Sequence, residues 1–386
     1  MPNLTLLRQQ VNYHRARAGP SMRINPSQRA DLEIPDELMG THSGEQFLHY
    51  DSGVGDSKRI IVFATAKNLE LLRNCNEWFM DGTFKACPSI FYQLFTVHVK
   101  LFSSKVIPVI YAFLPAKDGV TYRKLFELIH KAVDGSLPQV IHLDFEKALM
   151  NELSARFPLA EIVGCNFHFN QSLWRHIQSD PKLCHEYLNN LDANMNLRML
   201  AALAFVPCAQ VRSVFAKLLE SDFIVKHMPV FSAFINYFEK TWVGREFSAP
   251  IFPLEWWNCY DATLHGTART NNSVEAWHSA FARKLASSHP TFYKLIEVLK
   301  AEQGSVEFAV CNTEAQGNDN VSKRVYRDRQ KRLVEIVNVF ENMDNIKYLK
   351  AIAQNIKNMQ TRVIVRRTKP KSVECGSLVG LGREVA

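Results

Sequence analysis

The sequence predicts an α/β fold, a five-stranded mixed sheet flanked by helices and interrupted by an all-helical insertion. Three observations carry this prediction. Residues 91–102 and 106–114 are rich in β-branched and aromatic residues, which is typical of strands. Residues 119–133 then place apolar side chains at helical spacing and lead into a short apolar strand at 139–144. Beyond residue 171 the strand signals stop and helical periodicity takes over until about residue 260.

The strands and helices alternate in an order that predicts the topology. Three strands in succession form an antiparallel meander, and helical crossovers bring two further strands beside the first one. The first and fourth strands of the sheet are therefore neighbours at its centre. In chain order we expect a strand-like segment at 59–64, strands at 78–84, 91–102 and 106–114 (the last two joined through Ser103 and Ser104), a helix at 119–133, a strand at 139–144, a helix at 146–157 and a strand at 161–169.

The same reading divides the chain into five parts. They are a polar, helical extension at 1–58, the sheet core at 59–170, a helical insertion at 171–260, a region at 261–310 that completes the core, and a basic helical segment with a tail at 311–386. Within the last part, residues 312–322 are expected to be a loop, residues 325–343 a helix, and the chain after about residue 361 a poorly ordered tail.

Composition excludes several classes of protein. The chain has 386 residues, of which 47% are hydrophobic and 22% charged, as in a folded globular protein. It has no apolar run long enough for a transmembrane helix, so no membrane partner is expected. Its eight cysteines form no Cys-x-x-Cys pair, which favours a reduced, intracellular protein over a disulfide scaffold.

Positive charge is concentrated near the C-terminus. The net charge is +8, while residues 323–371 alone carry fourteen Lys and Arg against four acids, a charge of +10. Such a segment can neutralise phosphates, although a solvated helix face or a nuclear-import signal explains it as well. The candidate DNA contacts in it are Lys323, Arg324, Arg327, Arg329, Lys331 and Arg332.

Three acids stand out by their placement. Asp81 lies within the apolar strand at 78–84, and Asp144 ends the strand at 139–144, just before a helix. Because these strands are predicted neighbours, the two carboxylates would face each other across one strand spacing of about 4.8 Å and would stay ionised only beside cations. Glu275 lies in the first turn of a helix capped by Asn272 or Ser273, which can return it to the aspartates. Three such carboxylates can bind two Mg²⁺ or Mn²⁺ ions roughly 3.5–4 Å apart, as in phosphodiester chemistry.

Each acid also has a plainer interpretation. Asp81 precedes a glycine and can be a turn residue. Asp144 can cap the helix that follows it, and Glu275 can be a first-turn residue that complements the helix dipole. Spacing alone leaves both interpretations open.

Taken together, these blocks resemble the Mutator-like element (MULE) transposase domain over roughly residues 60–300. The blocks occur in the order of that family. They are Asp81-Gly-Thr-Phe84, Phe91-Tyr-Gln-Leu94, Leu143-Asp-Phe-Glu-Lys-Ala148, Gly164-Cys-Asn-Phe-His-Phe-Asn-Gln171 and Thr270-Asn-Asn-Ser-Val-Glu-Ala-Trp-His278.

This resemblance implies a fold and an activity. The family is similar to RNase H-like DDE transposases and integrases, in which a helical insertion separates the second Asp from the Glu. The match implies that Asp81, Asp144 and Glu275 form the acidic triad and hold two Mg²⁺ or Mn²⁺ ions. It further implies a nuclear enzyme that cleaves and joins DNA, with transposon ends and target DNA as partners, acting by analogy as a homo-oligomer.

Further residues gain candidate roles from the same match. The family carries a Cys-x-x-His element, here Cys165 and His168, which is half of a zinc site or a support for the active site. His278 can share the face of Glu275 and order a carboxylate or contact phosphate, or it can be a surface histidine. Lys85 and Arg269 are near the acids in sequence and are candidate phosphate contacts.

The sequence departs from the family in one respect. No cysteine precedes Cys75 and no histidine follows His289, so neither an N-terminal nor a C-terminal Cys/His finger is evident. Two alternatives to an active transposase therefore stay open. One is a domesticated, non-catalytic nuclear protein that binds DNA or protein, and the other is a nuclease acting on RNA–DNA hybrids.

Overall fold

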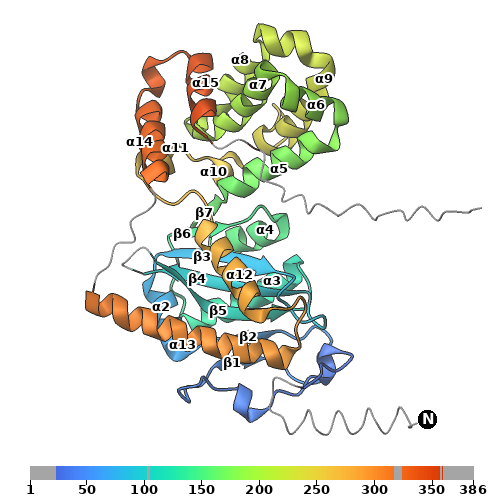
Figure 1. Ribbon diagram of the computed structural model, residues 1–386, viewed down its shortest axis with the longest axis vertical. Coiled ribbons are helices and arrows are strands. Elements are labelled where there is room, and N and C mark those ends of the chain that lie inside the picture. The colour runs from blue at the N-terminus through green and yellow to red at the C-terminus, as the bar shows by residue number, and fades with distance from the viewer. Residues whose placement is uncertain (1–22, 102–104, 317–323, 357–358, 360–386) are drawn as a thin grey trace, which may run out of the picture.

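The structure is a computed structural model that describes residues 23–101, 105–316, 324–356 and 359. It has an α/β lobe built on one sheet and a helical lobe beyond one edge of that sheet (Figure 1). The predicted Ser103–Ser104 connection and the tail after residue 361 lie outside the described residues. Within the described residues, no helix is long and apolar enough to cross a membrane.

The sheet has seven strands in the order β1-β2-β5-β4-β3-β6-β7. Strands β3, β4 and β5 are antiparallel neighbours, whereas β6 runs parallel to β3 and β7 parallel to β6. The first and fourth predicted strands, β3 and β6, are therefore neighbours as expected. The strands are β1 (Leu48–Asp51), β2 (Ile61–Phe63), β3 (Glu77–Thr83), β4 (Gln93–Lys100), β5 (Val106–Leu114), β6 (Val140–Leu143) and β7 (Glu161–Gly164).

The α/β class is confirmed, but the sheet is wider than the five strands predicted. Strand β2 pairs antiparallel with β5, and β1 pairs with β2. All three residues of β2 are buried, because this strand lies between β1 and β5 in the sheet. Strand β1 lies inside the stretch predicted as polar and helical. Its four residues, Leu48-His-Tyr-Asp51, are too few for periodicity to identify a strand.

The last strand is shorter than predicted. It ends at Gly164, and helix α5 (Asn166–Ser179) begins at once, so the predicted strand at 161–169 is wrong beyond residue 164. Phe169, Leu173 and Ile177 lie on one buried face of this helix, four residues apart. The alternation of aromatic and polar residues at 165–169 fits a strand equally well, which is the usual ambiguity of a short apolar run.

Helices cover both faces of the sheet. Helices α2 (Ala66–Asn74), α3 (Gly119–Ala132) and α4 (Lys147–Arg156) share a core with one face. Helices α12 (Asn272–Leu285) and α13 (Phe292–Gln316) share a core with the other face and with the N-terminal segment. Because α13 continues to Gln316, the loop predicted at 312–322 is wrong for residues 312–316.

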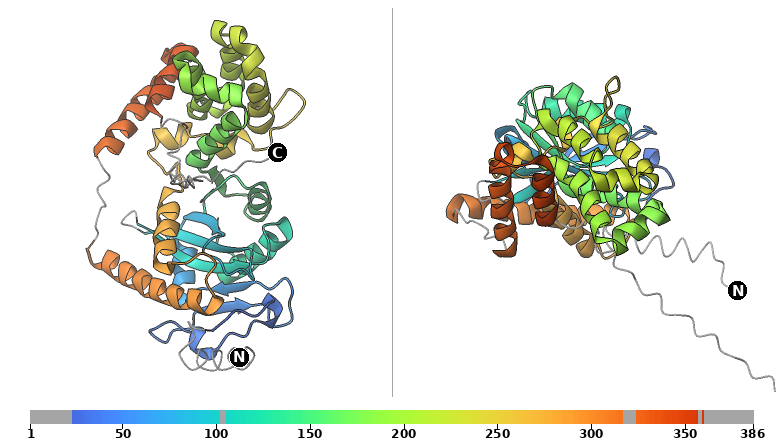
Figure 2. Two further views of the ribbon diagram at one scale, coloured as in Figure 1. Left: turned by 45° about the vertical axis from the view of Figure 1, so that its right-hand side comes forward. Right: turned by 90° about the horizontal axis from the view of Figure 1, so that it is seen from above.

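The helical lobe is joined to the sheet through α5, which leaves the β7 edge (Figure 1). A third hydrophobic core holds this lobe together and includes residues from α5 to α11 and from α14 and α15. Two views show that the last two helices lie against the lobe (Figure 2). The remaining α-helices of the lobe are α6 (Pro181–Asn189), α7 (Leu191–Ala202), α8 (Val211–Leu219), α9 (Asp222–Phe238), α10 (Leu254–Trp257), α11 (Tyr260–Leu264), α14 (Arg324–Asn338) and α15 (Asn345–Asn355).

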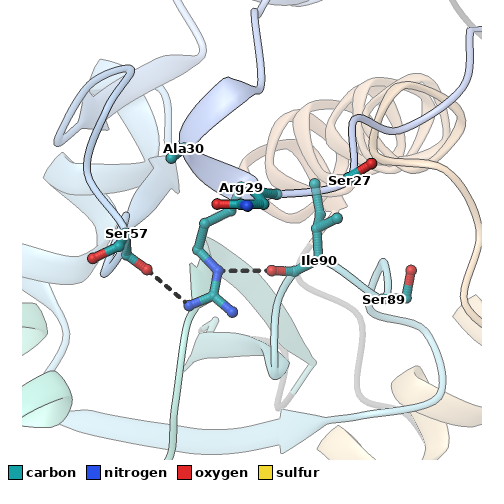
Figure 3. Close-up of a pocket in the computed structure, with 7 residues that line it drawn as sticks. Ser27, Arg29, Ala30, Ser57, Ser89 and Ile90 are labelled. Carbon is teal, nitrogen blue, oxygen red and sulfur yellow. Dashed lines mark hydrogen bonds between the residues drawn. The ribbon is translucent and has the colours of Figure 1, made fainter.

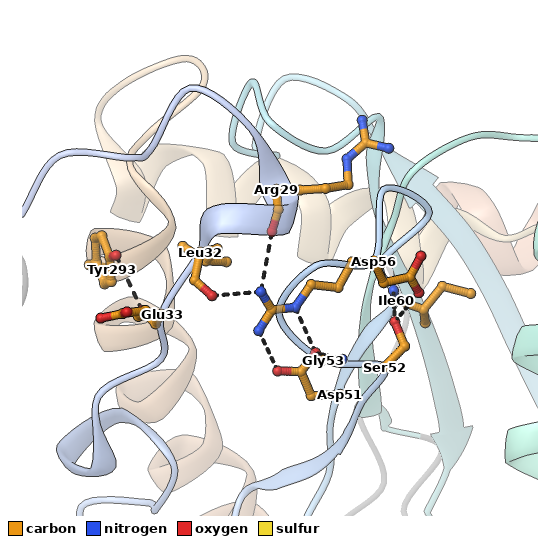
Figure 4. A network of polar contacts seen from close by, with 10 residues as sticks. Arg29, Leu32, Glu33, Asp51, Ser52, Gly53, Asp56, Ile60 and Tyr293 are labelled. Atoms are coloured by element: carbon orange, nitrogen blue, oxygen red, sulfur yellow. Dashed lines mark hydrogen bonds and ion pairs between the residues drawn. The ribbon is translucent and has the colours of Figure 1, made fainter.

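Two arginines attach the N-terminal segment to the sheet. The buried guanidinium of Arg59 forms a two-point contact with Asp51, at 2.7 and 2.6 Å, and donates to the backbone oxygen of Leu32 (Figure 4). Nearby, Arg29 donates to the carbonyl oxygens of Ile90 and Ser57 at a small polar pocket (Figure 3). Both sets of contacts satisfy backbone carbonyls that strand pairing leaves free.

Candidate active site

Asp81 and Asp144 lie at the same end of two adjacent parallel strands. Phe79 of β3 pairs with His142 of β6, and each aspartate follows two residues later. Both aspartates line a pocket of about 100 Å³. The backbone N–H of Gly82 donates to Asp81 Oδ1 (2.7 Å), which sets the orientation of this carboxylate. The predicted meeting of the two acids across neighbouring strands is therefore present in the structure.

Glu275 reaches these aspartates because the start of α12 is anchored to the sheet. The residue before the helix is Asn271, not Asn272 or Ser273 as predicted, and its side chain forms no capping bond. The buried Asn271 instead donates from Nδ2 to the backbone oxygen of Met80 (3.0 Å) and from its backbone N–H to Cys165 Sγ (3.2 Å). These two contacts hold the first turn of α12 against β3 and the start of α5.

Two histidines lie between the acids. His168, in the first turn of α5, has Nδ1 at 2.6 Å from Asp144 Oδ1 and Nε2 at 3.6 Å from Glu275 Oε1. His278, one turn after Glu275, has Nε2 at 3.2 Å from Asp81 Oδ2. The structure therefore brings all three predicted acids together, with Cys165, His168 and His278 beside them.

Burial and neighbouring negative charges raise the pKa of two of the carboxylates, Asp144 and Glu275. Burial raises the pKa of Asp144, and the nearby charge of Asp81 raises it further. Burial also raises the pKa of Glu275, with additional contributions from Asp144 and Asp81. For His168, burial by itself would lower the pKa, but the contacts with Asp144 and Cys165 outweigh it and raise the pKa to about 10. Without a bound cation, a protonated His168 is the positive charge that compensates the acids.

Several atoms of this site are left without hydrogen bonds. Asp144 Oδ1, His168 Nδ1 and Glu275 Oε1 are buried and have no hydrogen-bond partner among the described residues. The 2.6 Å approach of Asp144 to His168 does not have the alignment of a hydrogen bond, so we describe it as an ion pair. Buried polar atoms are normally paired, and converging unpaired carboxylate oxygens are what a divalent cation would bind.

The two predicted phosphate contacts near the acids, Lys85 and Arg269, form no ion pair with the carboxylates of this cluster among the described residues. Lys85 is exposed, and its backbone oxygen accepts the N–H of His289. Arg269 donates to Thr263 Oγ1 (3.0 Å) and to the side chain of Gln330 in α14, so its guanidinium ties two helices of the helical lobe together.

The basic residues of α14 differ in their exposure. Arg327, Lys331 and Arg332 are exposed, whereas Arg329 is half-buried. The side chain of Arg324 and all of Lys323 lie outside the described part of the chain. Three of the six predicted contacts are therefore available on the surface of α14.

Sequence reasoning missed a fourth acid at the site. Glu146 lines the same pocket as the two aspartates and accepts a hydrogen bond from Tyr122 Oη (2.7 Å), which in turn accepts one from Gln93 Nε2 (2.9 Å). Burial raises the pKa of Glu146, and Asp144 and Asp81 add to that rise. The available signal was its position two residues after Asp144, at the same strand end.

One protein-family model matches the part of the chain that contains the two aspartates. The model of the MULE transposase domain matches residues 77–172, a segment that contains Asp81, Asp144, Cys165 and His168 and ends before Glu275. A search of the curated proteins found no match. Residues 77–172 of this chain therefore form a MULE transposase domain.

Proposed function

We propose that this protein is a DDE-type transposase that cleaves DNA strands and transfers them to a target. The single observation that carries the proposal is the convergence of Asp81, Asp144 and Glu275 at one site, where buried oxygens of Asp144 and Glu275 have no hydrogen-bond partner among the described residues. The match to a MULE transposase domain supports the same class of reaction. The central strand order β5-β4-β3-β6-β7 supports an RNase H-like core.

The residues present fit a pair of divalent cations. Asp81, Asp144 and Glu275 would hold Mg²⁺ or Mn²⁺, whose chemistry when bound is to polarise the scissile phosphate and to activate the attacking hydroxyl. His278 orders the Asp81 carboxylate, and His168 contacts the other two acids. Asn271, the residue before α12, holds the start of this helix and therefore Glu275 in place through its contacts with Met80 and Cys165.

DNA is the proposed substrate, as transposon ends and as target. The exposed Arg327, Lys331 and Arg332 on α14 support contacts to phosphate, since they lie on a segment with strong positive charge. We propose residues 59–170 and 261–310 as the catalytic core, with the helices of 171–260 as an insertion. A nuclear location and a homo-oligomer on DNA complete the proposal.

A plasmid-nicking assay with the full chain tests the activity without knowledge of the DNA ends. We expect nicking of supercoiled DNA in Mn²⁺ or Mg²⁺ and none in EDTA. Asp81→Asn, Asp144→Asn and Glu275→Gln should each lower the rate by more than about 100-fold, since even outer-shell partners of a metal cost 10–100-fold. Asp192→Asn, at an exposed acid of the helical lobe, is the matched control and should nick like the wild type.

Three outcomes would overturn the proposal. Equal nicking by Asp81→Asn and the wild type would mean that a contaminant or another site cleaves the DNA. Salt-dependent DNA binding without cleavage in either metal would favour the domesticated, non-catalytic alternative. Preference for an RNA–DNA hybrid over duplex DNA would instead identify a hybrid-directed nuclease.

A further inference from the structure

A cluster of mixed donor atoms surrounds Asp144. One ligand atom each from Asp144, Cys165 and His168 lies within 4.8 Å of the others. The three residues come from the end of β6, the residue before α5 and the first turn of α5. The local fold itself brings them together, because the backbone N–H of Cys165 donates to the oxygen of Leu143 (2.8 Å) and so continues the pairing of β6 with β7.

The donor atoms of Asp144 and His168 form an ion pair with each other at 2.6 Å but no hydrogen bond, so a cation could take the place of the His168 proton between them. Asp144 Oδ1 and His168 Nδ1 are buried and have no hydrogen-bond partner among the described residues. Cys165 is 2% exposed, and its sulfur accepts the N–H of Asn271 at 3.2 Å. A thiolate that binds a metal can keep that hydrogen bond, because N–H donation stabilises the negative charge on sulfur.

The second nitrogen of His168 supports the same arrangement. Its Nε2 lies 3.6 Å from Glu275 Oε1, while Nδ1 belongs to the cluster. Histidines that ligate metals commonly direct their other ring N–H at a carboxylate, which fixes the tautomer and the ring orientation. Glu275 Oε1 is placed to serve His168 in this way, so Glu275 would meet a cation through its other carboxylate oxygen.

We infer that the cation held by Asp144 is bound by a mixed oxygen, nitrogen and sulfur site, in which His168 Nδ1 and Cys165 Sγ are ligands together with the carboxylate. This inference rests on the proposed function, since it concerns the cation at the same acids. Three protein ligands leave a position open for water or a phosphate oxygen. On ligation the Cys165 S–H bond and the Nδ1–H bond of protonated His168 both break, the two electron pairs bind the cation and both protons pass to solvent.

Metal preference follows from the donor types. Mg²⁺ prefers oxygen ligands, whereas imidazole and thiolate favour later divalent metals such as Co²⁺ and Zn²⁺. The site should therefore bind Co²⁺ at least about tenfold more tightly than Mg²⁺, and Mn²⁺ with intermediate affinity. An all-carboxylate site would not discriminate in this way.

Cobalt absorption spectra of the full chain test the sulfur ligand. Titration of the wild type with Co²⁺ should produce a thiolate-to-cobalt charge-transfer band in the near ultraviolet. Cys165→Ser should remove this band, whereas Cys259→Ser should keep it, since Cys259 is a buried cysteine whose thiol instead contacts the oxygen of Trp257. An identical band in wild type and Cys165→Ser, or no band in the wild type, would overturn the inference.

Electron paramagnetic resonance of bound Mn²⁺ tests the nitrogen ligand and covers the case in which Cys165→Ser fails to fold. The wild type should show coupling of Mn²⁺ to an imidazole nitrogen, and His168→Gln should lose it together with at least about tenfold in Mn²⁺ affinity. Absence of nitrogen coupling in the wild type would contradict the inference. Retention of that coupling in His168→Gln would contradict it as well.

The spectroscopic and nicking experiments test this inference and the proposed function separately. Metal-dependent nicking with no sulfur or nitrogen signature would leave the transposase proposal intact and remove the mixed-donor site. Sulfur and nitrogen signatures without nicking in any metal would do the reverse.

Discussion

At the scale of single residues, a charged side chain can be buried only where the fold supplies partners for its charge and its hydrogen bonds. The Arg59 side chain is 2% exposed, yet its nitrogens contact both oxygens of Asp51 and two backbone carbonyls. Breaking such a pair leaves an uncompensated buried charge, which costs much more than the pair contributes. An ion pair on the surface carries no comparable penalty.

The first prediction concerns this buried pair. Asp51→Ala should lower the free energy of unfolding by about 3–5 kcal/mol, because Arg59 would stay buried without its counter-charge. Glu37→Ala, which breaks the exposed pair with Arg23, is the control and should cost no more than about 1 kcal/mol. Urea unfolding followed by circular dichroism measures both. Similar losses in the two variants would contradict the argument.

The second prediction concerns pH. A hydrogen bond with His142, 2.8 Å long, lowers the pKa of Glu77. A lowered pKa in the folded state stabilises the protein above the unfolded pKa, and this contribution is lost as pH falls through the folded value. Glu77→Gln should therefore destabilise by about 1 kcal/mol at pH 7, and its difference from the wild type should shrink as pH falls below about 4.3, the ordinary pKa of glutamate, and vanish once Glu77 is protonated in the folded protein. A difference that persists in acid would show that the loss is not ionic.

At the scale of elements, the junctions after β6 and β7 determine the geometry of the site. Gly164 ends β7 in close contact with Phe145, the residue after Asp144. A Cβ at Gly164 would lie 2.2 Å from the Phe145 ring and 2.7 Å from the backbone oxygen of Trp256. A glycine is required here because backbone and ring approach so closely.

The third prediction tests this close approach. Gly164→Ala should lower the free energy of unfolding by about 1–3 kcal/mol, since Phe145 or the strand must shift. Gly304→Ala is the matched control, because Gly304 lies within helix α13 with no atom near the position of a Cβ. That substitution should stabilise the protein by about 0.5–1 kcal/mol. Thermal and urea unfolding measure both variants. A change of the same sign in the free energy of unfolding of both would contradict the prediction.

At the scale of the whole molecule, the site unites segments that lie far apart in the chain. Asp81 and Asp144 belong to the sheet, whereas Glu275 follows the helices that run from α5 to α11. The helical lobe has its own core, to which α14 and α15 also contribute. A cation that binds all three acids would therefore stabilise the folded arrangement as a whole.

The fourth prediction is a stabilisation by metal. Mn²⁺ at about 100 times its dissociation constant should add about 2.7 kcal/mol to the free energy of unfolding, and EDTA should remove it. Burial and neighbouring negative charges raise the pKa of Glu275. Ionised Glu275 therefore lowers the free energy of unfolding of the metal-free protein. Glu275→Gln should therefore be at least as stable as the wild type in EDTA and gain less from Mn²⁺. Equal gains in both proteins would place the metal elsewhere.

Much of the fold and of the site was predictable from local patterns. Alternation identified β4 and β5, and helical spacing identified α3. The order of these elements by itself predicts that Asp81 and Asp144 lie on neighbouring strands. Handedness and connection rules explain this success, since few topologies satisfy them.

Other features depended on contacts that no local pattern encodes. The edge strand β1 exists because β2 offers it a partner, and the strand-like segment at 59–64 joins the sheet because β2 pairs with β5. Helix α5 replaces a predicted strand because its aromatic residues are buried against the helical core. Glu146 and Asn271 escaped notice because their roles come from residues distant in sequence, Tyr122 and Met80.

The sequence by itself determined the α/β class, the adjacency of two acidic strand ends and the identity of the third acid as a candidate. Only the tertiary structure decided that Glu275 reaches the aspartates and that His168 lies between Asp144 and Glu275. The physical reason is that strand and helix periodicity are short-range properties of the chain. The distance between side chains more than a hundred residues apart is set by the packing of whole elements.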